Sequence, residues 1–297
     1  MEEEKFETPP KVGFRDKKLN REIFELLGID LFFIFMAGLL PAILGLGLGG
    51  FLKSEYLGKW QFYPFLFFSG LIAFNVLKLL EIFTQGKVDC IAHDPEQGLL
   101  NFSWTRNPIK LFFISLIVFS LLGMFSAYKN TFFVGVPQAM FPPETKNNIV
   151  NILFSAEPAA SSETIFFTAI VMSGLFSLVL YFMRKKNWEL NKGSYFVTII
   201  PLSLICGLLW MGFHSLAYGG QDVALWATFM FGTLGALMTF MLNSIIPWYV
   251  WHFCNNAYVS MNSLYGDTSI LMITLVINLI IIVPFIMITI AKRKKKM

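Results

Sequence analysis

The sequence predicts an all-α protein, a polytopic membrane helix bundle of about eight transmembrane helices with both termini cytosolic. Its 297 residues are 56% hydrophobic and 14% charged, whereas soluble domains are about one quarter charged. Apolar runs recur at roughly the 20-residue length that a helix needs to cross a bilayer. Most of the 23 Lys and Arg residues lie between alternate runs, as the excess of positive charge in cytosolic loops predicts.

The apolar runs begin after a charged N-terminal segment, residues 1–30. The first run is too long for a signal-peptide core and lacks a small-residue cleavage site, so we interpret it as a retained anchor. The seventh run is the least apolar and rich in aromatic residues, and we expect it inside the bundle rather than against lipid. The eight predicted spans are 31–52, 62–83, 111–127, 163–183, 194–216, 222–245, 247–264 and 268–290.

The placement of charge sets the predicted orientation. Eight crossings from a cytosolic N-terminus put the basic residues of 1–30, 84–110, 184–192 and the C-terminal tail inside. The tail is expected to bind anionic lipid headgroups. The three cysteines have no CxxC spacing, which argues against a disulfide framework or a zinc knuckle.

Polar residues in three of the predicted spans indicate chemistry. Only three histidines occur, and two of them, His214 and His252, lie in apolar runs. An ionisable side chain at membrane depth costs a few kcal/mol unless it faces a partner or a water-filled cavity. Asn256 follows His252 by one helical turn, and Glu163 opens the span predicted at 163–183. We therefore expect these four side chains to form one site.

The four residue types fit the hydrolysis of an amide bond. A carboxylate beside a histidine can take a proton from water, here Glu163 with His214. A second histidine and an amide, His252 and Asn256, can donate hydrogen bonds to the oxyanion that forms on the attacked carbonyl. Two imidazoles and a carboxylate are also an ordinary zinc set with an open position for water. The residues alone leave these two mechanisms open.

Two motifs and their spacing resemble a known family. His252-x-x-x-Asn256 follows Trp-Tyr-Val-Trp and Pro247, and Trp210-x-x-x-His214 has the spacing of a Phe-x-x-x-His motif. In this the chain resembles the CAAX protease and bacteriocin-processing (CPBP) intramembrane endopeptidases, which include the type II prenyl-protein proteases. The resemblance covers roughly residues 149–262, and the first three predicted spans lie outside it.

The family's first motif, Glu-Glu-x-x-x-Arg, is matched in part. Aligning its first Glu with Glu163 leaves Thr164 and Thr168 at the positions of the second Glu and the Arg. Because both ionic residues are absent together, no unpaired charge is left in the membrane, which would cost several kcal/mol. The alternative register, with Ser162 and Glu163 as the motif pair, predicts an inactive protein. We prefer the first register because it keeps the catalytic Glu.

The resemblance implies an intramembrane endopeptidase in the cell membrane that cuts a prenylated or otherwise membrane-bound peptide. It implies that Glu163 and His214 activate water while His252 and Asn256 stabilise the oxyanion. No cofactor is favoured; Zn²⁺ held by Glu163, His214 and His252 is the alternative. The expected partners are membrane lipids and a lipidated or transmembrane peptide, with no nucleic acid. The implied organisation is a cytosolic segment 1–30, N-terminal helices and loops 31–148, a CPBP-like core 149–264, and a last helix and basic tail 265–297.

Other interpretations of these residues stay open. A Glu at a helix start can simply favour the helix dipole, and an intramembrane Asn is often a contact between helices. The substitutions in the first motif keep open a non-catalytic relative that acts as an immunity, scaffold or binding protein. A transporter using the polar groups as an ion path is less favoured, because no repeat symmetry is found. Simple counting also places Glu163 and His214 toward the outer face but His252 near the inner one, so convergence requires longer spans or a tilted or re-entrant seventh helix.

Overall fold

The computed structural model describes residues 25–28, 62–83, 108–129, 149–186, 188, 192–218 and 222–265. Throughout this part of the chain the regular structure is helical and no strand occurs, so the all-α class is confirmed. Helices lie at six of the eight predicted spans. The predicted spans 31–52 and 268–290, and with them both termini, lie outside the described residues.

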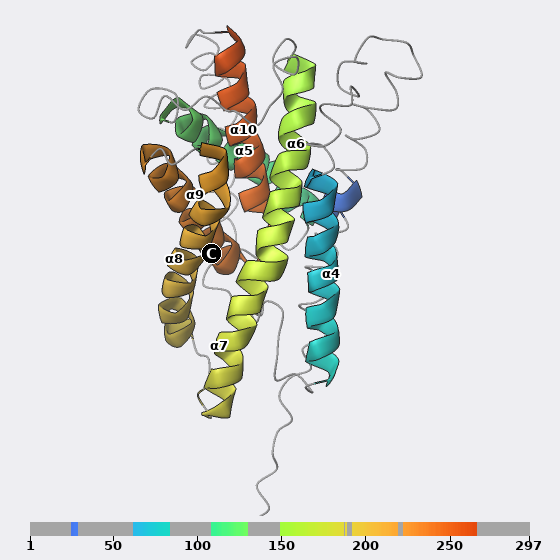
Figure 1. Ribbon diagram of the computed structural model, residues 1–297, viewed down its shortest axis with the longest axis vertical. Coiled ribbons are helices and arrows are strands. Elements are labelled where there is room, and N and C mark those ends of the chain that lie inside the picture. The colour runs from blue at the N-terminus through green and yellow to red at the C-terminus, as the bar shows by residue number, and fades with distance from the viewer. Residues whose placement is uncertain are drawn as a thin grey trace, which may run out of the picture.

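One long helical segment runs through most of the height of the molecule (Figure 1). It consists of α6 (Ile149–Phe166), the π-helix η6 (Phe167–Met172) and α7 (Ser173–Lys185), which follow one another without a break. The expected start of this span at Glu163 is therefore wrong, because the helix begins at Ile149. Glu163 lies well inside it, away from the N-terminal dipole, so the dipole interpretation of this residue is also wrong.

Two serine side chains of α6 bond to the backbone of the same helix beside Pro158. Pro158 lies within α6 and has no N–H to donate, which normally weakens a helix interior. The hydroxyl of Ser162 donates to the Pro158 carbonyl oxygen at 2.5 Å, and that of Ser161 does so at 3.5 Å. Such back-bonding satisfies buried hydroxyls without leaving the helix. Residues 156–162, which precede the predicted span at 163–183, are thus part of a buried helix.

Three further helices flank the long segment, α4 on one side and the pair α8 and α9 on the other (Figure 1). Helix α4 (Phe62–Phe83) packs against α6 and η6. On the other side, α8 (Lys192–Tyr218) and α9 (Asp222–Leu242) pack tightly against each other, and α8 also contacts η6. Small residues allow this close approach: a Cβ added at Gly207 would lie 2.7 Å from the backbone oxygen of Phe229. Close packing through glycine is a common way for helices to associate in membranes.

The remaining pair, α10 (Ile246–Tyr265) and α5 (Pro108–Lys129), forms the most extensive contact in the described structure. From Ile246 to Val259 every residue of α10 is buried except the half-buried Phe253, since α10 contacts α5, α6 and α9. The prediction that this weakly apolar segment lies inside the bundle is confirmed.

A tight turn brings α9 and α10 together. Asn243 has a positive φ of 50°, a left-handed conformation that Asn tolerates better than most residues and that commonly ends a helix. The hydroxyl of Ser244 accepts a hydrogen bond from the backbone N–H of Ile246 at 3.3 Å. This contact satisfies one of the free donors at the start of α10.

Within the described residues, three helical segments are long and apolar enough to cross a membrane: Ala156–Met183, Gly193–Ser215 and Ala224–Leu242. Large apolar side chains also face outward; Val197 on α8 is 69% exposed and Ile72 on α4 is 64% exposed. Contiguous apolar surface of this kind is rare on proteins that are surrounded by water. The membrane character predicted from composition is therefore supported at the level of these helices.

Candidate active site

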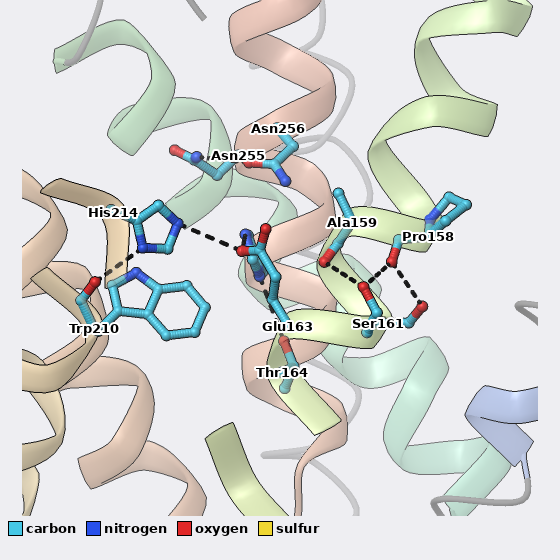
Figure 2. Close-up of polar contacts among 11 residues, drawn as sticks. Pro158, Ala159, Ser161, Glu163, Thr164, Trp210, His214, Asn255 and Asn256 are labelled. Atoms are coloured by element: carbon cyan, nitrogen blue, oxygen red, sulfur yellow. Dashed lines mark hydrogen bonds and ion pairs between the residues drawn. The ribbon is translucent and has the colours of Figure 1, made fainter. Parts of the chain in front are cut away.

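Three ionisable side chains from three different helices meet in the interior. The carboxylate oxygen Oε2 of Glu163, on α6, lies 3.5 Å from Nε2 of His214 on α8. The same oxygen lies 3.6 Å from Nε2 of His252 on α10. The residues are 3%, 7% and 4% exposed. Figure 2 shows the Glu163 carboxylate and the His214 imidazole pointing toward each other from neighbouring helices.

The convergence depends on the length of α6. Because α6 begins at Ile149, Glu163 lies more than three turns into the helix rather than at a helix end, where it would lie toward one face of the bundle. This removes the mismatch in depth that counting residues from the predicted spans implies. Ala159 and Ala160, one turn before Glu163, are buried, and such small side chains let helices approach closely.

Asn256 lies one turn beyond His252 on α10 and is 8% exposed. Its side-chain oxygen accepts a hydrogen bond from Nδ2 of Asn255 at 3.3 Å, and both amides are labelled above Glu163 in Figure 2. Among the described residues Asn256 makes no hydrogen bond to Glu163, His214 or His252. The structure therefore places it on the expected helix, one turn from the cluster, while its amide bonds to its neighbour.

Each imidazole is held by a second contact at Nδ1. In His214 this nitrogen lies 2.9 Å from the backbone carbonyl oxygen of Trp210, one turn earlier in α8. In His252 it lies 3.4 Å from the hydroxyl oxygen of Thr164. With Nδ1 held in this way, the Nε2 atoms of both rings are directed at Glu163. A histidine fixed at one nitrogen presents the other for chemistry in a defined orientation.

Aromatic rings enclose the two histidines. The ring centroid of Trp210 lies 4.8 Å from that of His214 and 5.4 Å from that of His252, and the ring of Phe231 lies 5.3 Å from His252. The aromatic residue of the Trp210-x-x-x-His214 motif thus has two functions, because its ring packs on both imidazoles and its carbonyl orients one of them. The motif spacing identified Trp210, but these contacts could be seen only in the structure.

The π-helix η6 begins three residues after Thr164 and changes the register of the long helical segment beside the site. It packs the ring of Phe167 4.5 Å from that of Trp210. At its end, the hydroxyl of Ser173 donates to the Thr168 carbonyl oxygen at 2.8 Å. Short π-helical segments are frequent at functional sites. No feature of the sequence analysis predicted this one.

The two threonines at the altered first-motif positions have different surroundings. Thr164 contacts His252, whereas the hydroxyl oxygen of Thr168 is buried without a hydrogen-bond partner among the described residues. Neither threonine carries a charge, so no unpaired ion is buried at these two positions.

A second buried acid, Glu157, was not identified as a candidate from the sequence. Glu157 is 1% exposed, and its Oε1 accepts a hydrogen bond from the hydroxyl of Tyr249 at 3.3 Å. It lies before residue 163, where the sequence analysis places the start of the fourth span, and was not considered as a site residue. The available signal was the run Ala-Glu-Pro-Ala-Ala-Ser-Ser-Glu, in which small residues surround two acids.

Zinc would have to lie about 2.0–2.2 Å from each nitrogen and oxygen ligand. In the described part of the chain no group of three or more His, Cys, Asp or Glu side chains is arranged so that it could hold a metal ion. Oε2 of Glu163 lies 3.5 Å from Nε2 of His214 and 3.6 Å from Nε2 of His252. Zinc binding by these three residues stays a prediction, and no step below passes through a metal.

Comparison with protein-family models, with curated proteins and with solved structures finds no match to this chain. The functional assignment is therefore based on the residues of the site, their spacing and their geometry.

Proposed function

We propose that this chain is a multi-pass intramembrane endopeptidase of the CPBP type that hydrolyses a peptide bond in a lipidated or membrane-bound peptide. The observation that carries the proposal is the contact of one Glu163 carboxylate oxygen with Nε2 of both His214 and His252. Three helices bring an acid and two histidines to a buried point, and the cost of burying such groups is hard to account for unless they act together.

In the proposed reaction Glu163 and His214 take a proton from a water molecule as its oxygen attacks the carbonyl carbon of the peptide. The electron pair of the carbonyl moves to its oxygen, and His252, with the amide of Asn256 once it turns from Asn255, donates hydrogen bonds to that oxyanion. The proton held by Glu163 and His214 then passes to the leaving nitrogen as the C–N bond breaks. General base catalysis and oxyanion stabilisation each supply roughly 100-fold or more of rate enhancement.

The surroundings of the site support an apolar, membrane-bound substrate. Aromatic rings enclose the histidines, and the outer faces of α4 and α8 carry exposed Ile, Leu and Val side chains. Such surfaces suit lipid and acyl or prenyl chains better than a soluble peptide. The choice of a prenylated peptide comes from the resemblance to the CPBP family.

The test is cleavage of a panel of quenched lipidated peptides by the purified protein in detergent. We expect His214→Ala and His252→Ala each to lower turnover by about 100-fold or more, because each removes a group that contacts Glu163. Turnover should be indifferent to a chelator, since no step uses a metal. Full activity in either histidine variant would contradict the proposed roles.

The panel also distinguishes the rival assignments. Chelator sensitivity that zinc reverses would replace the water mechanism with a metal one. A wild-type protein that binds the peptides but cleaves none of them would favour the non-catalytic relative. That alternative is kept open by Thr164 and Thr168, which stand where the family's first motif has Glu and Arg. In that case the contact of Glu163 with two histidines would be a structural link between α6, α8 and α10.

A further inference from the structure

The two histidines of the site differ in what lies at Nδ1, and this decides where their protons are. In His214, Nδ1 lies 2.9 Å from the carbonyl oxygen of Trp210. A carbonyl oxygen can only accept a hydrogen bond, so Nδ1 carries the proton. A neutral imidazole has one N–H, and Nε2 of His214 is then an acceptor that faces Glu163.

His252 has a hydroxyl at the corresponding place. Its Nδ1 lies 3.4 Å from Oγ1 of Thr164, which is fully buried. A hydroxyl can donate as well as accept. When Thr164 donates to Nδ1, neutral His252 carries its proton on Nε2, 3.6 Å from Oε2 of Glu163. Both contacts of His252, with Thr164 and with Glu163, then join a donor to an acceptor.

We propose that Thr164 is a positioning residue whose hydroxyl donates to Nδ1 of His252 and so holds the proton of this histidine on Nε2. The two histidines are thereby made unlike each other: His252 presents an N–H to the site, and His214 presents a lone pair. The consequence for catalysis rests on the function proposed above, whereas the proton positions do not.

The competing arrangement uses the backbone of Ala160, which also forms a hydrogen-bonding contact with the His252 imidazole. A proton on Nδ1 of His252 could be donated to the Ala160 carbonyl oxygen. Nε2 of both histidines would then face the same carboxylate oxygen of Glu163 without a hydrogen between them. Acceptors that face each other in a buried site are costly. The arrangement with Thr164 as donor leaves one such contact, between His214 and Glu163, whereas the competing one leaves two, which favours donation by Thr164.

The opposite character of the histidines matches the two halves of the proposed reaction. Water activation needs an acceptor beside Glu163, and His214 supplies it through Nε2. An oxyanion needs a hydrogen-bond donor, and His252 supplies it only while its proton is on Nε2. A neutral hydroxyl at position 164 is sufficient for this, so the absence of a second Glu there does not by itself prevent activity.

The test is ¹⁵N magic-angle-spinning NMR of the full-length protein labelled at the histidine imidazoles and reconstituted in lipid. The chain has three histidines, so His93→Gln leaves two imidazoles, and a further His214→Gln identifies the signals of His252. The nitrogen that carries the proton is distinguished by its chemical shift. We expect a protonated Nε2 in the wild type and in Thr164→Ser, and a protonated Nδ1 in Thr164→Val.

The matched control is Thr239→Val, which makes the same substitution at a buried threonine of α9 whose hydroxyl bonds to the Gly235 carbonyl oxygen at 2.9 Å. It should leave the His252 signals unchanged. A protonated Nδ1 in the wild type, or signals that Thr164→Val does not change, would overturn the proposal. If Thr164→Val does not fold, the wild-type and Thr164→Ser spectra decide between the two proton positions.

Turnover separates this inference from the proposed function. We expect Thr164→Val to lower kcat by about 10- to 100-fold, as is typical for loss of a group that orients a functional histidine, and Thr164→Ser to restore it. A wild-type protein with the expected spectra but no turnover would reject the protease and leave the role of Thr164 in place. Turnover by a protein whose His252 carries its proton on Nδ1 would reject the role of Thr164 and leave the proposed protease in place.

Discussion

We expect the Glu163→Gln protein to hydrolyse its peptide substrate on the order of 1,000-fold more slowly than the wild type, within the range that a general base contributes. The amide has the size and shape of the carboxylate, so the packing of α6 is retained. It cannot accept the proton of the attacking water, and this is the property that the proposed mechanism requires. Initial rates with the best peptide of the quenched panel measure the loss.

Glu157→Gln is the matched control for this substitution. Both acids lie on α6 and both are buried, but Glu157 contacts Tyr249 on α10 rather than the histidines. It should retain turnover close to that of the wild type. Equal losses in the two variants would show that burial of an acid on α6, and not its contact with His214 and His252, is what the protein needs. Turnover that survives Glu163→Gln would remove Glu163 from the mechanism.

Gly207→Ala should be the most damaging small substitution in the helix pair formed by α8 and α9. A Cβ at this position would lie 1.9 Å from the Thr233 hydroxyl oxygen and 2.7 Å from the Phe229 carbonyl oxygen. Because the second contact is to backbone, the helices must separate, and overpacking of this kind costs about 1–3 kcal/mol. Thermal unfolding of the purified protein, followed by the loss of helical circular dichroism, measures the change.

The effect should reach the site as well, because α8 carries His214 two turns beyond Gly207. A displacement of about 1 Å in a reacting group can cost roughly 100-fold in rate. Gly212→Ala is the control: it lies on the same helix, and an added Cβ meets nothing within 4 Å. It should leave activity unchanged and stabilise the helix by about 0.5–1 kcal/mol. If both variants unfold at the same temperature, close packing at Gly207 does not hold the pair together.

The helices themselves were largely predictable. Apolar runs in 62–83, 111–127, 194–216 and 222–245 correspond to α4, α5, α8 and α9 within a few residues. The reason is that an apolar segment without access to water must hydrogen-bond its backbone internally, and a helix does so. The weak hydropathy of 247–264 correctly predicted that α10 is buried. The number of spans and the position of the termini stay predictions, since the first and last runs lie outside the described residues.

The start of α6 was not predictable by the same rule. The stretch before the predicted start at residue 163 contains Glu157, Pro158, Ser161 and Ser162, and these residues lower its hydropathy. In the folded protein the serine hydroxyls donate to backbone carbonyls of the same helix, and Glu157 is bonded to Tyr249 on α10. Local backbone acceptors satisfy the serines, and one partner distant in sequence, Tyr249, bonds to the buried acid of this helix.

By itself the sequence determined the helical class, the apolar character of the spans and the four residues proposed for chemistry, because these depend on residue type and on spacing along one helix. Only the tertiary structure decided which of the four meet. It brought Glu163 to both histidines, left Asn256 bonded to Asn255, and placed Thr164 beside His252. The physical reason is that contacts between α6, α8 and α10 depend on helix length, on the register change at η6 and on close packing at small residues. None of these three can be read from one segment alone.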